Sequence, residues 1–380
     1  MLFVVSFGML LSLTSWMSAT AIAPTLQLNW SLSSSQMGWL TTIVQFGFVV
    51  GTGLGALLNI ADLLSSRALF SASAFLAAVS NGVLLVADDF SEALPARFLT
   101  GFFLAGVYPP GMKMVSTWFQ SARGLAIGTV VGALTVGKAM PYLLKAAGGT
   151  ETSPVILGGT IAGLLASLLI AITYRDGPHP FPGRDFEWNQ VGKLFRHRKT
   201  MLATGGYLGH MWELYAMWTW IPTFLLTASA GMIADRMVDL VVFGTITMGA
   251  LGCIWGGVAA DRIGRHRVVN LAMAISGSCC IGVGVLFHAP FAILVALTWV
   301  WGFFVVADSA QFSALVTEVA PQDSVGTALM LQTSLGFLLT MLTIQIVPAI
   351  SGTFGWQWGF AILALGPVFG VSSILLLGRR

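Results

Sequence analysis

The fold of this chain is decided by residues 257–267, whose sequence is GVAADRIGRHR. The stretch is short, charged and interrupted by glycine, and it separates two apolar runs that are each long enough to cross a lipid bilayer. A connection of this kind is typical of a tight turn at the membrane surface. The stretch therefore predicts a membrane protein and marks one side of the membrane.

The composition also indicates an integral membrane protein. Of the 380 residues, 56% are hydrophobic and 9% are charged, whereas soluble domains carry roughly 25% charged residues. The mean hydropathy is +0.85. The formal net charge is only +3, and we find no basic patch with interleaved aromatic residues, so the sequence does not indicate a nucleic-acid partner.

The three cysteines lie in apolar runs, and their spacing does not match a metal-binding motif. We expect them to be structural residues that pack as small buried apolar groups. The sequence thus predicts neither a metal site nor a cofactor.

Apolar runs of about 20 residues recur along the whole chain, and each predicts one transmembrane helix. The first run is too long for the apolar part of a signal peptide and lacks a basic start. We therefore expect an all-α integral membrane protein with about twelve transmembrane helices. The predicted spans are 2–24, 37–58, 68–88, 94–115, 124–146, 153–173, 201–229, 238–260, 267–288, 290–313, 325–349 and 355–378.

The basic residues give the orientation. Most Lys and Arg side chains fall on one set of alternate connections, such as Arg67, the segment 175–200 and the turn 257–267, whereas the opposite set has little beyond Lys145 and Arg236. The positive-inside rule then predicts that both termini and the 257–267 turn are cytoplasmic. We expect a multi-pass protein of the inner or plasma membrane.

The segment 175–200 is the longest polar connection, and it contains several prolines. It predicts a cytoplasmic linker between an N-terminal six-helix bundle at 1–174 and a C-terminal six-helix bundle at 201–380. The two halves resemble each other. Gly101-Phe-Phe in the fourth span matches Gly302-Phe-Phe in the tenth, about 200 positions later. Two parallel, pseudo-symmetric repeats of this kind are typical of transporters, whose solute sites lie near the bilayer midplane at the repeat interface.

The turn motif places the chain near a known family. The chain resembles the major facilitator superfamily over essentially its whole length. In that family, a Gly is followed four residues later by Asp-Arg and then by Gly-Arg, which this chain matches at Gly257, Asp261, Arg262, Gly264 and Arg265. The earlier copy has Leu58 in place of the glycine and keeps only Asp62 and Arg67. The residues around Lys113 are similar to the nitrate/nitrite and cyanate porter branch.

The resemblance implies alternating access, with the charged turn as a latch at the cytoplasmic gate. We expect Gly257 to permit close helix packing, and Asp261 to pair with a nearby arginine or a helix N-terminus in one conformation only. The alternative is that the basic residues only fix the topology. The candidate gate residues are Asp62, Arg67, Gly257, Asp261, Arg262 and Arg265.

Ionisable residues inside the spans are the best candidates for a solute site, because burying a charge in a membrane is costly. Lys138 is about 15 positions into the fifth span, which corresponds to roughly 22 Å. Arg97 and Lys138 in the first half favour a small anion as the solute. The candidate solute-binding residues are Arg97, Tyr108, Lys138, His210, Trp218 and Gln311.

Glu213, Asp308 and His210 are the candidates for proton coupling. His210 and Glu213 are three positions apart and share a helical face, so they are expected to form a proton-carrying pair. Alternatively, Glu213 pairs with Arg97 or Lys138, Asp308 pairs with Lys138, or His210 has a structural role.

Together these features predict a secondary active transporter, monomeric and coupled to protons, for a small anionic solute. Three alternatives remain open at this stage: an exporter of amphipathic drugs or metabolites, an importer of soft metals through His and Met residues, and a receptor without transport activity. We do not expect an enzyme, because no set of nucleophile, base and orienting group is evident.

Overall fold

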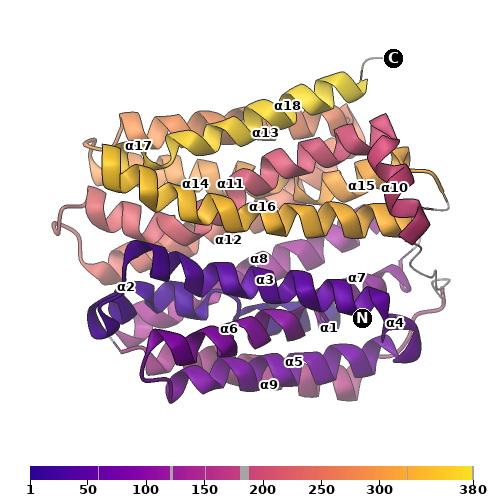
Figure 1. The fold of residues 1–380 in the computed structure, drawn as a ribbon, viewed down its shortest axis with the longest axis horizontal. Helices are drawn as coiled ribbons and strands as arrows, with labels where there is room; N and C mark the ends of the chain where they lie inside the picture. The colour runs from indigo at the N-terminus through magenta and orange to yellow at the C-terminus, as the bar shows by residue number, and fades with distance from the viewer. Residues whose placement is uncertain (59, 120–122, 150, 180–187, 323, 379–380) are drawn as a thin grey trace. The chain divides into compact units, whose positions relative to one another are not determined.

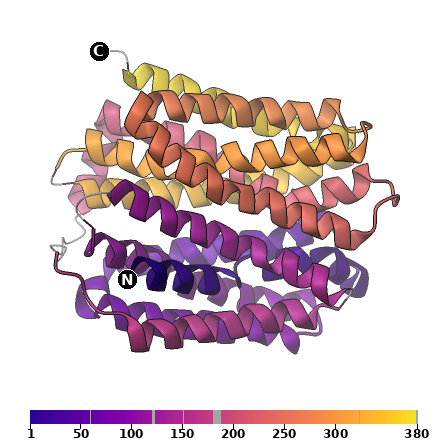
Figure 2. The same ribbon diagram turned by 180° about the vertical axis from the view of Figure 1, so that it is seen from behind.

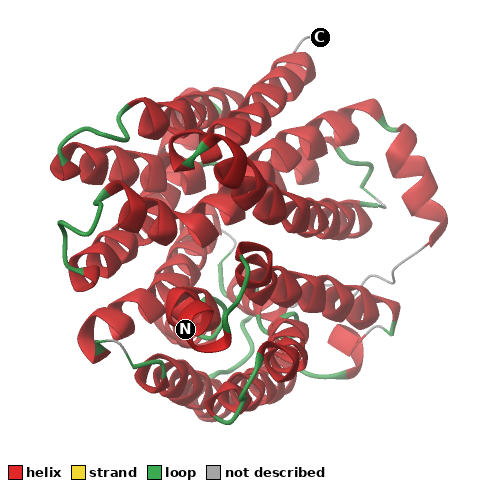
Figure 3. Ribbon diagram, turned by 60° about the vertical axis from the view of Figure 1, so that its left-hand side comes forward, coloured by secondary structure: helices red, strands yellow, loops and turns green. Residues whose placement is uncertain are grey.

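The computed structural model describes residues 1–58, 60–119, 123–149, 151–179, 188–322 and 324–378. These residues form helices joined by loops, and no strand occurs among them (Figure 3). Two compact units are present: the first comprises Met1–Gly183 and Ile221–Ile246, and the second comprises Arg184–Trp220 and Thr247–Arg380. The division that the sequence places at 175–200 stays a prediction.

Up to the linker, the described residues of the N-terminal part form nine α-helices and one 3-10 helix within the first unit (Figure 1). They are α1 (Leu2–Leu13), α2 (Ser18–Trp30), α3 (Ser34–Leu57), α4 (Ile60–Leu63), α5 (Ser66–Gly82), η1 (Val83–Leu85), α6 (Phe90–Leu104), α7 (Tyr108–Ser116), α8 (Arg123–Gly148) and α9 (Ser153–Thr173).

The remaining helices belong to the second unit, except that α11 and α12 are divided between the two units. They are α10 (Trp188–Arg196), α11 (Arg198–Ala228), α12 (Asp235–Ile263), α13 (Arg265–Val285), α14 (Phe291–Ala307), α15 (Ser309–Val319), α16 (Val325–Phe354), α17 (Trp356–Gly359), η2 (Ala361–Ala364) and α18 (Leu365–Gly378). Within this unit α13 packs against α14 and α18, as Figure 1 and the reverse view in Figure 2 show.

Ten helical segments of the described chain are long and apolar enough to cross a membrane. The two other predicted spans, 94–115 and 201–229, are also helical. The first is interrupted between α6 and α7, and the second is the single long helix α11, which carries basic residues at its start and His210 and Glu213 inside it. The all-α membrane fold predicted from the sequence is therefore confirmed.

Polar side chains begin several of these helices. Ser33 and Gln36 form a capping box at the start of α3. Asp89 caps α6, because its carboxylate accepts a hydrogen bond from the main-chain N–H of Glu92. The hydroxyl of Ser91 also donates to this carboxylate, and these hydrogen bonds hold the pKa of Asp89 below its ordinary value.

Glycines allow α3 and α6 to pack with their backbones in contact. A Cβ atom at Gly47 would overlap the main-chain oxygen of Phe98, one at Gly51 would overlap that of Phe102, and one at Gly101 would overlap that of Val44. Small residues at these positions are what close packing of membrane helices requires.

The same contact recurs in the second unit, which supports the internal repeat. Adding 201 to Gly51 and Phe102 gives Gly252 and Phe303, and a Cβ atom at Gly252 would overlap the main-chain oxygen of Phe303. The same offset relates the break between α6 and α7, at Val107, to the break between α14 and α15, at Asp308. The halves thus share helix contacts and helix breaks, not only sequence motifs.

The expected role of Gly257 in close packing is wrong. A Cβ atom there would have no atom of the described residues within 4 Å, whereas Gly252 and Gly256 pack against main-chain oxygens of Phe303 and Ala307. The contacting face of α12 lies one residue earlier than the sequence motif suggests.

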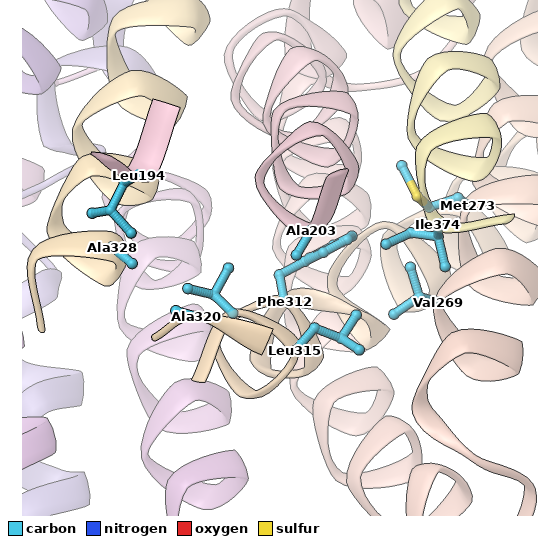
Figure 4. Packing of buried hydrophobic residues seen from close by; sticks show 10 residues of the cluster. Leu194, Ala203, Val269, Met273, Phe312, Leu315, Ala320, Ala328 and Ile374 are labelled. Carbon is cyan, nitrogen blue, oxygen red and sulfur yellow. The ribbon is translucent and has the colours of Figure 1, made fainter. Parts of the chain in front are cut away.

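A buried apolar cluster joins the helices at one end of the second unit (Figure 4). Phe312 of α15 lies beside Ala203 of α11, and Leu194 anchors α10 to α16 through Ala328. The cluster consists of Leu194, Ala203, Val269, Met273, Phe312, Leu315, Val316, Ala320, Ala328 and Ile374. It packs together α11, which carries His210, and α15, which carries Gln311.

Candidate functional site

Arg97 of α6 is fully buried in the first unit. Its guanidinium reaches the turn between α1 and α2, where the helix is interrupted and main-chain carbonyls lack their usual intrahelical partners. It donates hydrogen bonds to the main-chain oxygens of Ser15 (2.9 Å), Trp16 and Leu40 (3.4 Å), to the hydroxyl of Ser18 (3.1 Å) and to the side-chain oxygen of Asn81 (3.3 Å). Arg97 therefore ties α6 to α1, α2, α3 and α5.

Lys138 of α8 is buried beside the same turn. Its Nζ lies 4.3 Å from the ring centroid of Trp16, within the range of a cation–π interaction. The Trp16 ring also meets Phe48 with a centroid distance of 5.2 Å, and Phe48 meets Tyr108 at 6.3 Å.

Three of the predicted solute-binding residues, Arg97, Lys138 and Tyr108, are therefore grouped around Trp16. Sequence reasoning missed Trp16 itself. The signal that was available is a tryptophan placed among the hydroxyl residues of 12–18, inside a run long enough to be a span.

His210 of α11 lies at the break between α14 and α15 in the second unit. Its Nδ1 is 2.9 Å from Oδ1 of Asp308, and its Nε2 is 3.0 Å from the hydroxyl oxygen of Ser309. Asp308 Oδ1 has no well-aligned hydrogen bond among the described residues, so its contact with His210 is an ion pair whenever the imidazole is protonated. The rings of Tyr207 and Phe312 lie against the imidazole.

Glu213 does not pair with His210, which corrects the expected His–Glu pair. Its carboxylate accepts hydrogen bonds from the hydroxyl of Ser276 (2.9 Å), the thiol of Cys280 (3.3 Å) and the indole N–H of Trp301 (2.5 Å). These donors come from α13 and α14. Shared position on one helical face brought His210 and Glu213 near each other, but the facing helices give each a different partner.

Gln311 and Trp218 occupy different surroundings. The side-chain oxygen of Gln311 accepts a hydrogen bond from Nη1 of Arg265 at 2.8 Å. This contact joins a predicted solute-binding residue to a predicted gate residue. Trp218 is buried and packs edge-on against Tyr215, with a centroid distance of 5.4 Å.

At the charged turn, Arg265 contacts side chains of α15. Its Nε lies 2.7 Å from Oε1 of Glu318, at the end of α15. Sequence reasoning missed Glu318, because it was placed in a loop between two spans. Asp261 and Arg262 are exposed.

In the earlier copy of the turn, Arg67 is exposed near the start of α5. The side chain of Asp62 lies outside the described residues. The expected place of Asp62 at the cytoplasmic gate therefore stays a prediction.

A further buried ion pair lies within the first unit. Nζ of Lys145, in the last turn of α8, is 3.1 Å from Oδ1 of Asp239 in α12. Both side chains are at most 10% exposed. Asp239 was missed because it stands at the second position of the predicted span 238–260, where a carboxylate is expected to reach the interface.

No group of three or more His, Cys, Asp or Glu residues that could hold a metal ion is found in the part of the chain that the structure describes. The alternative of a soft-metal importer, which relies on His and Met ligands, stays open.

The sequence profile of the Major Facilitator Superfamily matches residues 5–234. The chain belongs to the major facilitator superfamily. It is similar to the Hexuronate transporter of Escherichia coli (strain K12), with 24% identity over 98% of this chain and 92% of that protein. It is also similar to the Probable sulfoacetate transporter SauU of Cupriavidus necator, with 23% identity over 70% of this chain and 66% of that protein.

The fold matches that of a bacterial homolog of the human lysosomal transporter Spinster, solved in an inward-facing and occupied conformation. The TM-score is 0.76 with 14% identity, over 100% of this chain and 96% of that structure. The predicted family is thus confirmed, and the chain is a multi-pass membrane transporter rather than an enzyme.

Proposed function

We propose that this member of the superfamily is a secondary active transporter that moves a small organic anion by alternating access. The observation that carries the proposal is Lys138, a cationic side chain buried in the middle of α8 and facing the Trp16 ring. A buried lysine in a membrane helix is costly and is characteristic of a functional site. Its ammonium group suits a carboxylate or sulfonate.

The names of the relatives agree with this solute class. Hexuronates and sulfoacetate are both small organic anions, and the proteins named for their transport are similar to this chain over most of its length. A positively charged residue at the solute site is the simplest feature that such transporters would need to share.

Arg97 has a different role in this proposal from the one expected from the sequence. Its donors are directed to main-chain oxygens and two side chains of neighbouring helices. We therefore assign it to holding the interrupted first span in place, so that Trp16 and Lys138 keep their relative positions. Direct contact with the solute is assigned to Lys138 and Tyr108.

Coupling to protons is assigned to the His210 and Asp308 pair. The imidazole and the carboxylate are buried together at a helix break. Adding a proton to Asp308 would remove the negative charge of the pair, and a discontinuous membrane helix is where transporters commonly place coupling ions. Glu213 remains a second candidate, since its carboxylate is also buried.

The remaining parts of the proposal concern the membrane. We place the protein in the inner or plasma membrane as a monomer. Both termini are assigned to the cytoplasm, because the linker that carries the exposed basic side chains of Lys193, Arg196, Arg198 and Lys199 is cytoplasmic by the positive-inside rule. The charged turn with Arg265, Gln311 and Glu318 would then belong to the cytoplasmic gate.

The proposal is tested with purified protein in liposomes, using radiolabelled small carboxylates and sulfonates with and without an imposed pH gradient. We expect saturable uptake of at least one anion, stimulated by an inwardly directed proton gradient. Uptake of cations or neutral drugs with no anion in the panel transported would refute the solute class. Anion uptake at the same rate with and without the pH gradient would refute only the proposed coupling to protons.

A further inference from the structure

Gln45 of α3 is completely buried, and neither its side-chain nitrogen nor its side-chain oxygen has a hydrogen-bond partner among the described residues. Most buried amides in proteins are paired, because removing an amide from water without a partner is unfavourable. Gln332 of α16 is also buried, but of its two side-chain polar atoms only the oxygen is both fully buried and without a hydrogen-bond partner among the described residues. Gln45 therefore needs an explanation more than any other buried polar side chain of the first unit.

The neighbours of Gln45 on the same helical face locate it. Thr41 is four positions before it and Phe48 is three positions after it, so the three residues lie on one side of α3. The hydroxyl of Thr41 is 2.6 Å from that of Thr20 in α2, and Phe48 packs edge-on against Trp16. The amide of Gln45 thus lies between two contacts to the segment around Trp16.

Lys138 approaches the same segment from α8, with its Nζ over the Trp16 ring. Trp16 is therefore contacted from two helices of the first unit: by Lys138 of α8, and by Phe48 of α3, which lies on the same helical face as Gln45. Lys138 can supply a positive charge, and Gln45 can supply both a hydrogen-bond donor and an acceptor.

We propose that Gln45 is a solute-binding residue that selects hydroxylated carboxylates, with Lys138 holding the carboxylate and the Gln45 amide hydrogen-bonding a solute hydroxyl. This inference rests on the proposed function, because it uses the same site. A hydroxyl both donates and accepts, so an amide suits it better than a charged group does. Sites built to bond a hydroxyl discriminate strongly against analogues that lack it, since their own polar groups would then be unpaired.

A purely structural role makes a different prediction. If Gln45 held helices together, Gln45→Met would lower the melting temperature. If the amide serves the solute, Gln45→Met removes an unpaired buried polar group and keeps nearly the same volume, so the unliganded protein should be equally or more stable while binding is lost. Thr100→Val is the matched control, because Thr100 is buried in the adjacent α6 and bonds only within its own helix, to the main-chain oxygen of Ala96.

The experiment measures binding to the purified protein in nanodiscs by isothermal titration, together with melting temperatures. The probes are two matched pairs: galacturonate with cyclohexanecarboxylate, and gluconate with hexanoate. We expect the wild type and Thr100→Val to prefer the hydroxylated member of at least one pair. Gln45→Met should weaken binding of that member by about tenfold or more. It should change the affinity for the analogue without hydroxyls by less than about twofold. Gln45→Asn, which keeps a shorter amide, should lie between them.

Two results would overturn the inference and leave the proposed function standing, provided that Lys138→Met loses binding of both members of a pair. In the first, Gln45→Met weakens binding of both members equally. In the second, Gln45→Met weakens binding of neither member. A lowered melting temperature with unchanged discrimination would assign Gln45 to structure and overturn it as well. Binding of no carboxylate by the wild type would remove the proposed function and this inference together.

Discussion

Nδ1 of His210 lies 2.9 Å from Oδ1 of Asp308, and both side chains are only 2% exposed. Asp308 is the residue at which the tenth span is interrupted, between α14 and α15. The contact between the two side chains connects the charge of one carboxylate to the geometry of three helices, α11, α14 and α15. This makes the pair a better candidate for coupling than its two members taken separately.

Asp308→Asn removes the carboxylate but keeps the side-chain size. We expect it to abolish accumulation driven by a pH gradient while exchange of labelled for unlabelled anion continues, because exchange does not require net proton movement. Paired uptake and exchange assays in liposomes measure both quantities. His210→Gln should behave similarly. If the two variants kept full dependence on the gradient and Glu213→Gln lost it, the coupling site would be Glu213.

Arg97 should matter for stability rather than for solute affinity. Arg97→Ala leaves the main-chain oxygens of Ser15, Trp16 and Leu40 without this donor, and each buried acceptor left unpaired typically costs about 1 to 3 kcal/mol. We expect little folded protein in the membrane, with Arg97→Lys only partly restoring it, since an ammonium cannot reproduce the guanidinium fork. Detergent melting curves check this. If the Arg97→Ala protein were stable but no longer bound the anion, Arg97 would be assigned to solute binding instead.

The Lys145 and Asp239 pair can be tested by removing its charges one at a time and together. Either Lys145→Met or Asp239→Leu alone leaves an uncompensated buried charge and should destabilise the protein by about 3 kcal/mol or more. The double change Lys145→Met with Asp239→Leu removes both charges and should recover most of that loss. A thermal-melting double-mutant cycle gives the coupling energy directly. Simple additivity of the two single effects would show that the pair is not coupled.

The charged turn should act through Arg265 and Glu318. Their side chains are 34% and 52% exposed, so the pair contributes only about 0 to 1 kcal/mol to folding. Its effect on the balance between inward-open and outward-open states is the useful readout. We expect Glu318→Gln to change cysteine accessibility at the cytoplasmic end more than Asp261→Asn does. The opposite order would restore Asp261 as the latch residue.

Much of the fold could be predicted because hydropathy and glycine spacing are local properties. Runs of apolar residues gave the helices, and the Gly101 and Gly302 motifs gave a repeat that the shared helix breaks at Val107 and Asp308 support. The position of the break inside the fourth span was not predicted, because α6 and α7 are separated by a turn whose residues are themselves apolar.

The candidate site was predicted less completely, since partners come from other helices. Helical spacing placed His210 beside Glu213, yet Asp308 and Trp301 decide what each one contacts. Asp239 and Glu318 were overlooked because they stand near the ends of helices, where a charge usually needs no partner. Trp16 and Gln45 were overlooked because neither carries a charge, although Trp16 contacts Lys138 and Gln45 shares a helical face with Phe48, which packs against Trp16.

The central claim is that Lys138 binds the transported anion, and one measurement tests it most directly. Lys138→Met is compared with Thr135→Val, a change to a buried residue of the same helix whose hydroxyl bonds only within that helix. Equilibrium binding of a transported labelled anion is measured for both variants and for the wild type, after their melting temperatures have been shown to agree. We predict a loss of about tenfold or more for Lys138→Met and no change for Thr135→Val. Equal affinity in all three proteins would contradict the claim.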